Sequence, residues 1–349
     1  MSKRTGSILF MLLLFLVFTM LISSCLGSVK INISELISMI TYYTGISNVR
    51  HFQEQQAAVF LNIRLPRVLR GGMIGAALGV SGAAIQGLFR NPLAEPGLIG
   101  ISSGATLFAV LMIVLEIGVF KTLKGNLGSY ALSISAFIGA GITTMIVHRI
   151  AMKNGKTNIT SLLLSGIAIN ALAYAFIGLL TYLASDAQLR NITFWNLGSL
   201  GGANWQSVSI LLPFVLIPLV ALPFLSKSLN TLALGESQAI HMGVAVKQIK
   251  TFVVVLSTMA VGASVAVAGT IGFIGLIIPH ILRMAFTSDH RLVIPGSALL
   301  GAALLTLADL VARTIVSPAE LPIGILTAMI GTPFFIYIII SERNKKHIP

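Results

Sequence analysis

Long apolar runs, each bounded by charged residues, proline or glycine, recur along almost the whole chain. A helix that crosses a membrane needs roughly 20 predominantly apolar residues. Segments that approach this length cover residues 8–29, 67–89, 95–115, 128–149, 159–183, 206–225, 249–270, 273–286, 293–314 and 322–340. The pattern therefore predicts an all-α polytopic membrane protein with about ten transmembrane helices. The eighth segment is too short to span alone, so we expect it to be broken or half buried by protein.

One long interior segment, residues 226–250, has a different pattern. Its apolar residues are interleaved with polar and charged ones, and Gly235 and Gly243 divide it into two short amphipathic pieces. An amphipathic, water-exposed segment inside a membrane protein is typical of a surface that contacts a soluble partner. We therefore expect residues 226–250 to form such a contact within a single membrane domain that spans residues 1–349.

Composition agrees with a membrane protein. Of the 349 residues, 56% are hydrophobic and 9% are charged, whereas soluble domains have about 25% charged residues. The formal net charge of +13 is interpreted as the excess of Lys and Arg in cytoplasmic loops, so no nucleic-acid partner is expected. The single cysteine, Cys25, excludes a disulfide framework and a cysteine-rich metal site within one chain.

Loop charges predict the orientation of the helices. An even number of spans places both termini on one side, and the loops on that side hold most of the basic residues, so both termini are predicted to be cytoplasmic. Arg64, Arg67 and Arg70 cluster on the opposite side, against this bias. The cluster either reaches lipid phosphates or forms a landing site for acidic groups of a soluble partner.

The N-terminus imitates a cleavable lipoprotein signal. Lys3 and Arg4 precede an apolar run that ends shortly before Cys25. Since so many spanning segments follow, we interpret this stretch as the first transmembrane helix.

Small residues recur at every fourth position of the second predicted helix. They are Gly71, Gly75, Gly79, Ala83 and Gly87. Such a stripe lets neighbouring helices approach closely, which predicts a central place for this helix in the bundle.

Two isolated features allow catalytic or structural interpretations. Gly79-Val80-Ser81-Gly82 matches the G-x-S-G pattern of intramembrane serine proteases, with His280 as a conceivable base. Helix packing accounts for Ser81 without chemistry, so a protease remains a remote alternative. His280 follows Pro279 and is expected to bond a carbonyl freed at a helix break, although a ligand or proton-relay role stays open.

Asp309 is a carboxylate inside an apolar helix, and such residues are costly and often functional. Arg313 lies one turn later on the same face. A structural ion pair between the two is our first interpretation, with a pathway-lining or docking role as the alternative. The chain has no distributed series of acidic and histidine residues in its spans, which disfavours a secondary transporter.

The chain has no recognisable nucleotide site. Gly155-Lys156-Thr157 resembles the end of a phosphate-binding loop, but Ile150 stands where that loop requires its first glycine. No metal site or bound cofactor is expected either.

Several motifs together resemble the FecCD family, the permease subunits of bacterial ABC importers for iron-siderophores, haem and cobalamin. They occur in chain order between about residue 60 and residue 340. The motifs are Arg64-Leu-Pro-Arg67, residues 75–82 with Gln86, Arg90-Asn-Pro-Leu-Ala-Glu-Pro-Gly97, Leu234-Gly-Glu236 with Ala239, Met242-Gly-Val244, residues 272–280 with Arg283, Asp289-His-Arg291 and Glu320-Leu-Pro-Ile-Gly324.

This resemblance implies a homodimer with the type II ABC importer permease fold in the bacterial inner membrane. It also implies two cytoplasmic ABC ATPase subunits, which would bind ATP and Mg, a periplasmic substrate-binding protein, and surrounding membrane lipid. The chain itself would then not be an enzyme.

The resemblance also assigns residue roles. Docking of the binding protein falls to Arg64, Arg67 and Arg313. Coupling to the ATPase falls to Leu234, Gly235, Glu236, Ala239 and Gly243, and Ala239 is expected to be small because the ATPase contacts it closely. Helix packing or the pathway involves Gly71, Gly75, Gly79, Ala83, Gln86, Asn91, Pro92, Gly275, Pro279, His280 and Asp309.

Within the family, residues 193–205 and 308–322 look most like haem permeases. Haem is therefore the expected substrate, with a ferric siderophore and cobalamin as alternatives.

Overall fold

The computed structural model describes residues 3–27, 29–115, 130–153, 156–316 and 319–345, and these are helical apart from one short hairpin and the connecting loops. Seven described helices are long and apolar enough to cross a membrane, and three shorter apolar helices accompany them. The all-α prediction is confirmed. The expected number of about ten spans is reached only when the three shorter helices are included.

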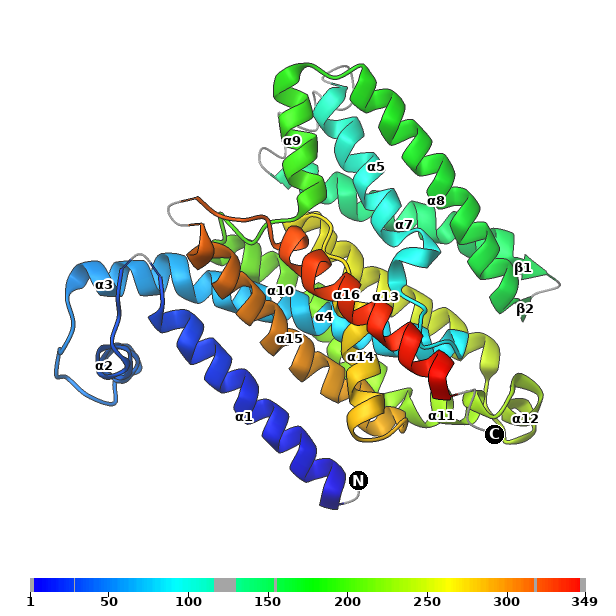
Figure 1. Cartoon of the computed structure of the whole chain (residues 1–349), viewed down its shortest axis with the longest axis horizontal. Helices are drawn as coiled ribbons and strands as arrows, with labels where there is room; N and C mark the ends of the chain where they lie inside the picture. The colour runs from blue at the N-terminus through cyan, green and yellow to red at the C-terminus, as the bar shows by residue number, and fades with distance from the viewer. Residues whose placement is uncertain (1–2, 28, 116–129, 154–155, 317–318, 346–349) are drawn as a thin grey trace.

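The helices fall into two packed groups (Figure 1). The larger group contains α1 (Lys3–Cys25), α4 (Leu65–Phe89), α10 (Trp205–Phe224), α13 (Val246–Ala268), α14 (Ile274–Ala285), α15 (His290–Ile315) and α16 (Ile323–Lys345). The smaller group contains α5 (Ile101–Val114), α7 (Ala131–Ala151), α8 (Ile159–Tyr182) and α9 (Asp186–Leu197). Contacts between α7 and α13 join the two groups.

The small-residue stripe places α4 at the centre of the larger group, as the sequence predicts. A Cβ atom added at Gly75 would lie 2.2 Å from the carbonyl oxygen of Gly301 in α15, and one added at Gly79 would lie 2.1 Å from that of Ser297. At Gly82 the obstacle is the carbonyl oxygen of Gly275 in α14, at 1.8 Å. Because no side chain fits at these distances, the stripe allows direct backbone contact between helices.

The rest of the stripe is also buried. Gly71 faces Leu200, Gly87 faces the ring of His290, and Ala83 is fully buried.

The start of this helix differs from the expected residue 67. A continuous helical stretch begins at α3 (Glu54–Val59), passes through a π-helical turn, η1 (Phe60–Arg64), and continues as α4. Pro66 has no amide hydrogen to donate, and the wider π turn lies directly before it. Arg64 therefore lies within the continuous helical stretch, together with Arg67 and Arg70, instead of before it.

The short eighth segment forms α14, which has only 12 residues. It follows a non-helical stretch in which Gly269 and Phe273 have φ angles of 72° and 69°. Gly275, Pro279 and His280 are all buried. The prediction of a broken segment held among other helices is confirmed.

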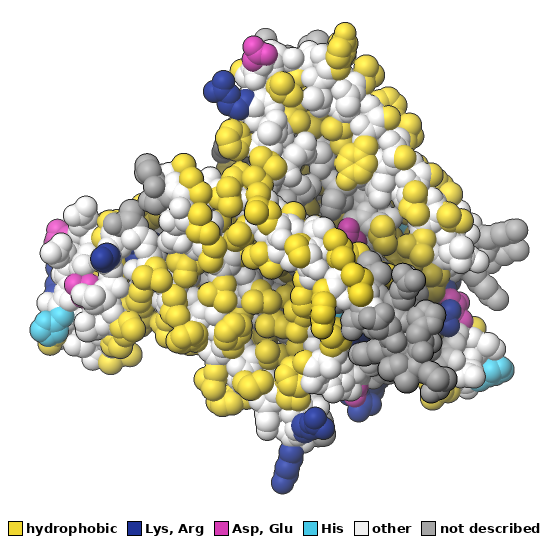
Figure 2. Space-filling view, viewed as in Figure 1, with side chains coloured by type: hydrophobic (Ala, Val, Ile, Leu, Met, Phe, Trp, Pro, Cys, Tyr) yellow, Lys and Arg dark blue, Asp and Glu magenta, His cyan; other side chains and the backbone are white. Residues whose placement is uncertain are grey.

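The two ends of the molecule carry different short elements (Figure 1). One end holds α2 (Ile33–Tyr43) and α3, and the other holds α11 (Ser226–Ala233), α12 (Glu236–His241) and the hairpin of β1 (Met152–Lys153) and β2 (Lys156–Thr157). The start of α1 and the end of α16 lie towards the α12 end. Figure 2 shows hydrophobic side chains over the broad middle of one face and Lys and Arg near its ends, as expected for a surface in lipid.

Candidate functional site

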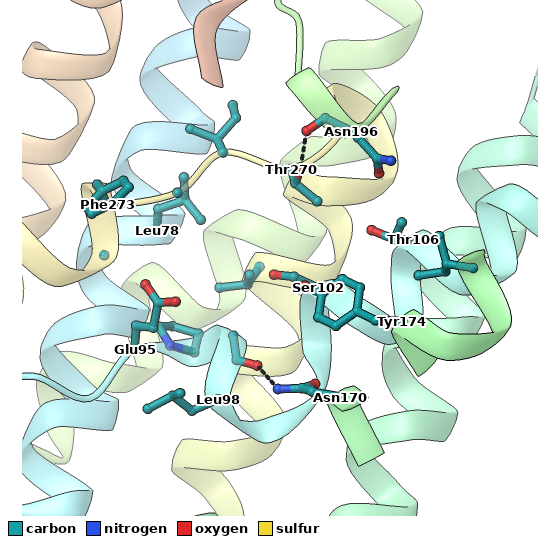
Figure 3. A pocket seen from close by; sticks show the side chains of 17 residues that line it. Leu78, Glu95, Leu98, Ser102, Thr106, Asn170, Tyr174, Asn196, Thr270 and Phe273 are labelled. Atoms are coloured by element: carbon teal, nitrogen blue, oxygen red, sulfur yellow. Dashed lines mark hydrogen bonds between the residues drawn. The ribbon is translucent and has the colours of Figure 1, made fainter. Parts of the chain in front are cut away.

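A cavity of about 450 Å³ lies between the two groups of helices (Figure 3). It is lined by Leu78, Glu95, Pro96, Gly97, Leu98, Ser102, Thr106, Asn170, Tyr174, Ile177, Asn196, Val261, Thr270, Ile271, Gly272, Phe273 and Gly275. Three of the spanning helices, α4, α8 and α13, and two of the shorter apolar helices, α5 and α14, contribute, together with η2 (Pro96–Ile99), α9 and the loop before α14. A concave space of this size with a few polar groups is typical of a small-molecule site.

Hydrogen bonds fix the polar wall of the cavity. The Ser103 hydroxyl donates to Asn170 Oδ1 at 2.5 Å, and Asn170 Nδ2 donates to the carbonyl oxygen of Gly97 at 3.1 Å. The loop before α14 is held by Thr270, whose hydroxyl donates to the carbonyl oxygen of Asn196 at 2.5 Å. This wall therefore joins α5, α8, α9 and the loop before α14.

Among the described residues that line the cavity, Glu95 is the only Asp, Glu, Lys or Arg. Figure 3 shows its carboxylate and the ring of Tyr174 facing the same space, with Ser102 between them. Tyr174 is 58% exposed in the single chain although it lines the cavity. The cavity is therefore open on the α8 side.

A buried ion-pair network joins the start of α4 to the end of α15. Arg67 donates through Nε to Asp309 Oδ2 and through Nη2 to Asp309 Oδ1, both at 2.9 Å. The same guanidinium donates through Nη1 to Glu320 Oε1 at 2.6 Å, in the loop before α16. This hydrogen bond lowers the pKa of the Glu320 carboxyl. The pair is therefore present at neutral pH and is lost as the pH falls through the lowered pKa.

The expected ion pair between Asp309 and Arg313 is weak. Arg313 Nε lies 3.9 Å from Asp309 Oδ2, which is too far for a hydrogen bond. Arg313 instead donates to the hydroxyl of Ser23 in α1 at 2.9 Å, and to the Ser23 carbonyl. The main partner of Asp309 is thus Arg67, which the sequence interpretation did not identify.

The other two arginines of the cluster, Arg64 and Arg70, donate hydrogen bonds to backbone carbonyls. Arg64 donates to the carbonyl oxygens of Ser24 and Cys25 at 2.8 Å each, at the C-terminal end of α1, where a cation is favourable. Arg70 donates to the carbonyl oxygens of Leu200 and Gly201 at 2.5 and 2.9 Å. Arg64, Arg67 and Arg70 are all buried, so none is free to reach a lipid phosphate in this conformation.

A polar junction also joins α4 to α14 near the other end. Gln86 donates to the carbonyl oxygen of Leu276 at 3.0 Å and accepts a hydrogen bond from Arg283. In the turn after α4, Asn91 Oδ1 accepts a hydrogen bond from the Leu93 amide at 2.9 Å.

Pro92 and His280 border the same small gap beside α14. The hydroxyl of Ser81 is buried and has no hydrogen-bond partner among the described residues. The geometry therefore gives Ser81 no base, which weighs against a protease.

The segment 226–250 contains two short helices, α11 and α12, with a positive φ at Gly235 and Gly243, as the two predicted breaks require, and its residues 246–250 already belong to α13. Leu234 is exposed at the turn. Ala239 is completely buried against its own chain, so the expectation that a partner contacts it directly is not supported by this packing. The exposed apolar side chains of α12 and the turn after it are Ile240 and Met242.

Glu236, at the start of α12, pairs with Lys250 Nζ at 2.7 Å. Lys250 also donates to the carbonyl oxygen of Thr157 at 2.7 Å and is itself buried. Sequence reasoning missed this lysine because a single Lys near a helix start resembles any cytoplasmic anchor. It also missed Asn170 and Tyr174, although their spacing of four residues on an apolar helix was a usable signal.

Comparisons with known proteins agree with this fold and these motifs. The model of the FecCD transport family matches residues 13–341. The hemin transport system permease protein HmuU of Yersinia pestis is 46% identical over 292 residues, covering 82% of this chain and 85% of the relative. The vitamin B12 import system permease protein BtuC of Klebsiella pneumoniae is 39% identical over 346 residues, covering 99% and 96%.

A solved structure supports the same assignment. It is an inward-facing conformation of a metal-chelate type ABC transporter, with a TM-score of 0.83 and 34% sequence identity, covering 96% of this chain and 99% of that chain. The ordered motifs, the helical bundle and these matches show that the chain belongs to the FecCD transport family.

Proposed function

We propose that this chain is the membrane-spanning subunit of an ABC importer that moves haem across the bacterial inner membrane. The family and the fold support an importer permease, and the 46% identity to a hemin permease favours haem. Cobalamin is the second candidate, because a vitamin B12 permease aligns with 99% of the chain. A ferric siderophore is the third.

The cavity is the observation that carries this proposal. It lies between two groups of helices, and its walls combine apolar side chains with Glu95, Asn170 and Tyr174. A flat apolar macrocycle with polar edges matches such a lining. Movement of α5 and α8 relative to α4 and α13 would open the space towards one end and then the other, as alternating access requires.

A second copy of the chain would complete the cavity. Tyr174 lines the space and is 58% exposed in one chain. In a twofold dimer, a residue beside the symmetry axis meets its own copy, so the opening on the α8 side would face the same opening in the partner. We therefore favour a homodimer over a pair of different permease subunits.

The energy source lies on other subunits. We place α11 and α12 in the cytoplasm, against two ABC ATPase subunits that bind ATP and Mg, with both termini on the same side. Leu234, Ile240 and Met242 form the exposed apolar patch that such a partner would cover.

At the opposite end, a periplasmic binding protein would deliver the substrate. Arg64, Arg67 and Arg313 remain its proposed docking residues, but each is engaged within the chain. A carboxylate of the binding protein would have to displace Asp309 or Glu320 from Arg67, or a carbonyl from Arg64. Docking by these residues therefore requires the outer ends of α1, α4 and α15 to rearrange.

Transport in proteoliposomes tests the proposal. The permease is co-purified with the ABC ATPase that binds it and reconstituted with the ATPase facing the vesicle lumen. ATP is enclosed in the vesicles, and haem, cyanocobalamin or a ferric siderophore is supplied outside with its binding protein. We expect ATP-dependent accumulation of haem, which stops when the phosphate-binding lysine of the ATPase is replaced. Accumulation of one of the other two compounds alone would contradict haem as the substrate, and ATP-independent movement down an ion gradient would contradict the whole assignment.

A further inference from the structure

Lys250 connects three segments at the α12 end of the molecule. It lies in the second turn of α13 and is buried, with 3% of the residue exposed. Its ammonium donates to Glu236 Oε1, at the start of α12, and to the carbonyl oxygen of Thr157, in β2, at 2.7 Å each. A buried ammonium is stable only when its hydrogen bonds are satisfied, so these two contacts fix its position.

The Thr157 contact leads directly to α8. Thr157 pairs with Met152 in the β1–β2 hairpin. The next residue, Asn158, is the N-cap of α8 and accepts a hydrogen bond from the Ser161 amide at 3.1 Å. The Thr157 carbonyl that accepts from Lys250 therefore belongs to the peptide bond that leads into the N-cap residue of that helix.

The helix that begins there carries part of the cavity wall. Asn170 and Tyr174 both lie on α8. At a rise of 1.5 Å per residue, Asn170 is about 17 Å along the helix from Ile159. Because an α-helix is stiff over this length, a displacement of its first turn moves both side chains.

The other partner, Glu236, belongs to the segment that we assign to the ATPase contact. Its side chain is 38% exposed, and the exposed Ile240 lies one turn further along α12. A force applied to α12 from outside thus reaches Glu236 first, then Lys250, and then Thr157. The elements concerned lie at the same end of the molecule in Figure 1.

We propose that Lys250 is a positioning residue for transport, which transmits the movement of α12 to the β1–β2 hairpin and α8 and so opens or closes the cavity. This inference rests on the proposed function, because it requires that a partner ATPase moves α12. The inference adds a specific chain of contacts, through Lys250, that joins the ATPase contact of α12 to the cavity wall.

The link makes a distinctive prediction for charge reversal. Glu236→Lys combined with Lys250→Glu restores an ion pair between α12 and α13. A carboxylate cannot donate a hydrogen bond to the Thr157 carbonyl, so the connection to the hairpin stays broken. The swapped pair therefore separates a role in transmission from a simple role in holding α12 to α13.

The experiment measures ATP hydrolysis and substrate uptake together in proteoliposomes of the intact importer. For Lys250→Met we expect ATP hydrolysis to continue and uptake per ATP to fall at least about fivefold, the low end of typical coupling between sites. The swapped pair should show the same loss, and Lys250→Arg should keep most of the coupling because it retains a donor. Arg149→Met is the control, since it removes an exposed cation of α7 at the same end.

Hydrogen exchange in the same complexes gives a readout that protein stability alone does not change. In the wild type, trapping the ATPase with ADP and vanadate should alter exchange both in α12 and at the amides of β1 and β2. In Lys250→Met and in the swapped pair, the change should stop at α12.

Failure of this proposal is distinguishable from failure of the proposed function. If the wild type shows no ATP-driven uptake, the proposed function is wrong. If the wild type transports and either Lys250→Met or the swapped pair retains the normal uptake per ATP, Lys250 does not transmit the movement. Should Lys250→Met fail to assemble, the swapped pair and Glu236→Gln, which changes a partly exposed side chain, decide the question.

Discussion

Arg67 holds two carboxylates that are 242 and 253 residues away in sequence. The sequence marks Arg67 and Asp309 as unusual, because each breaks a rule for its position. It does not show that they meet. Arg313 is the nearest cation to Asp309 in sequence and is therefore its predicted ion-pair partner, yet the Arg313 guanidinium donates to Ser23 of α1 instead. The pairing depends on how α4 packs against α15, which only the folded bundle determines.

The two carboxylates of Arg67 should differ in their effect on stability. Asp309 is buried and Glu320 is 46% exposed at its side chain. Asp309→Asn removes the charge next to a buried guanidinium, so we expect a loss of about 1–3 kcal/mol. Glu320→Gln should cost about 0–1 kcal/mol, because solvent screens that pair. Thermal unfolding of the purified protein in detergent measures both.

A double replacement is the control for this comparison. Arg67→Met with Asp309→Leu removes the buried pair completely, and buried pairs replaced by apolar residues are often neutral or stabilising. The double variant should therefore be more stable than Asp309→Asn alone. Equal loss in Asp309→Asn and Glu320→Gln would contradict the assignment of Asp309 as the main partner.

At the scale of elements, the apolar pattern predicted where most helices lie, but it did not predict all of their boundaries or which side chains they expose. The windows found α14 as a short, broken segment, because length alone decides whether a helix can span. They missed the start of the second helix, since α3 is polar and Pro66 obscures the continuity through the π turn. The family resemblance placed Ala239 at a partner contact, whereas α12 buries it, and Ile240 and Met242 are the exposed apolar side chains of α12 and the turn after it.

This orientation of α12 changes which residue should be tested. A large residue at Ala239 would disturb packing inside the chain, so loss of transport in such a variant would not identify a partner contact. Ile240→Asp instead places a charge on the exposed face without touching the core. If this face contacts the ATPase, a desolvated aspartate there should weaken association by about 2 kcal/mol or more, measured by co-purification and titration in detergent.

The matched control is Ile46→Asp, an exposed isoleucine in the turn after α2 at the opposite end of the molecule. It should leave ATPase association unchanged. A similar loss in both variants would indicate a general effect on the protein, and no loss at Ile240 would move the contact to another surface.

At the scale of the whole molecule, the cavity could not be derived from the sequence. Its lining comes from segments between Leu78 and Gly275, and most of these residues are unremarkable in their own helices. Glu95 lies in a motif that marks the family, but its position in a cavity wall depends on the packing of η2 against α4 and α8. Family membership and the helical bundle were predictable because they depend on local patterns, whereas the cavity depends on long-range packing.

The open side of the cavity leads to a test of the dimer. In a variant with Cys25→Ser, a single cysteine is introduced at Tyr174 of α8 or at Phe18 of α1, which are both 58% exposed. If two copies meet beside the cavity, Tyr174→Cys should form a crosslink at twice the subunit mass under mild oxidation, because residues next to a twofold axis face their own copies. Phe18→Cys should remain uncrosslinked, since α1 packs on α15 on the other side of the bundle.

Saturating substrate should slow the Tyr174→Cys crosslink by occupying the space between the two copies. Equal crosslinking at both positions would indicate random collision, and a complex whose mass contains one copy of this chain would contradict the homodimer and the shared cavity together.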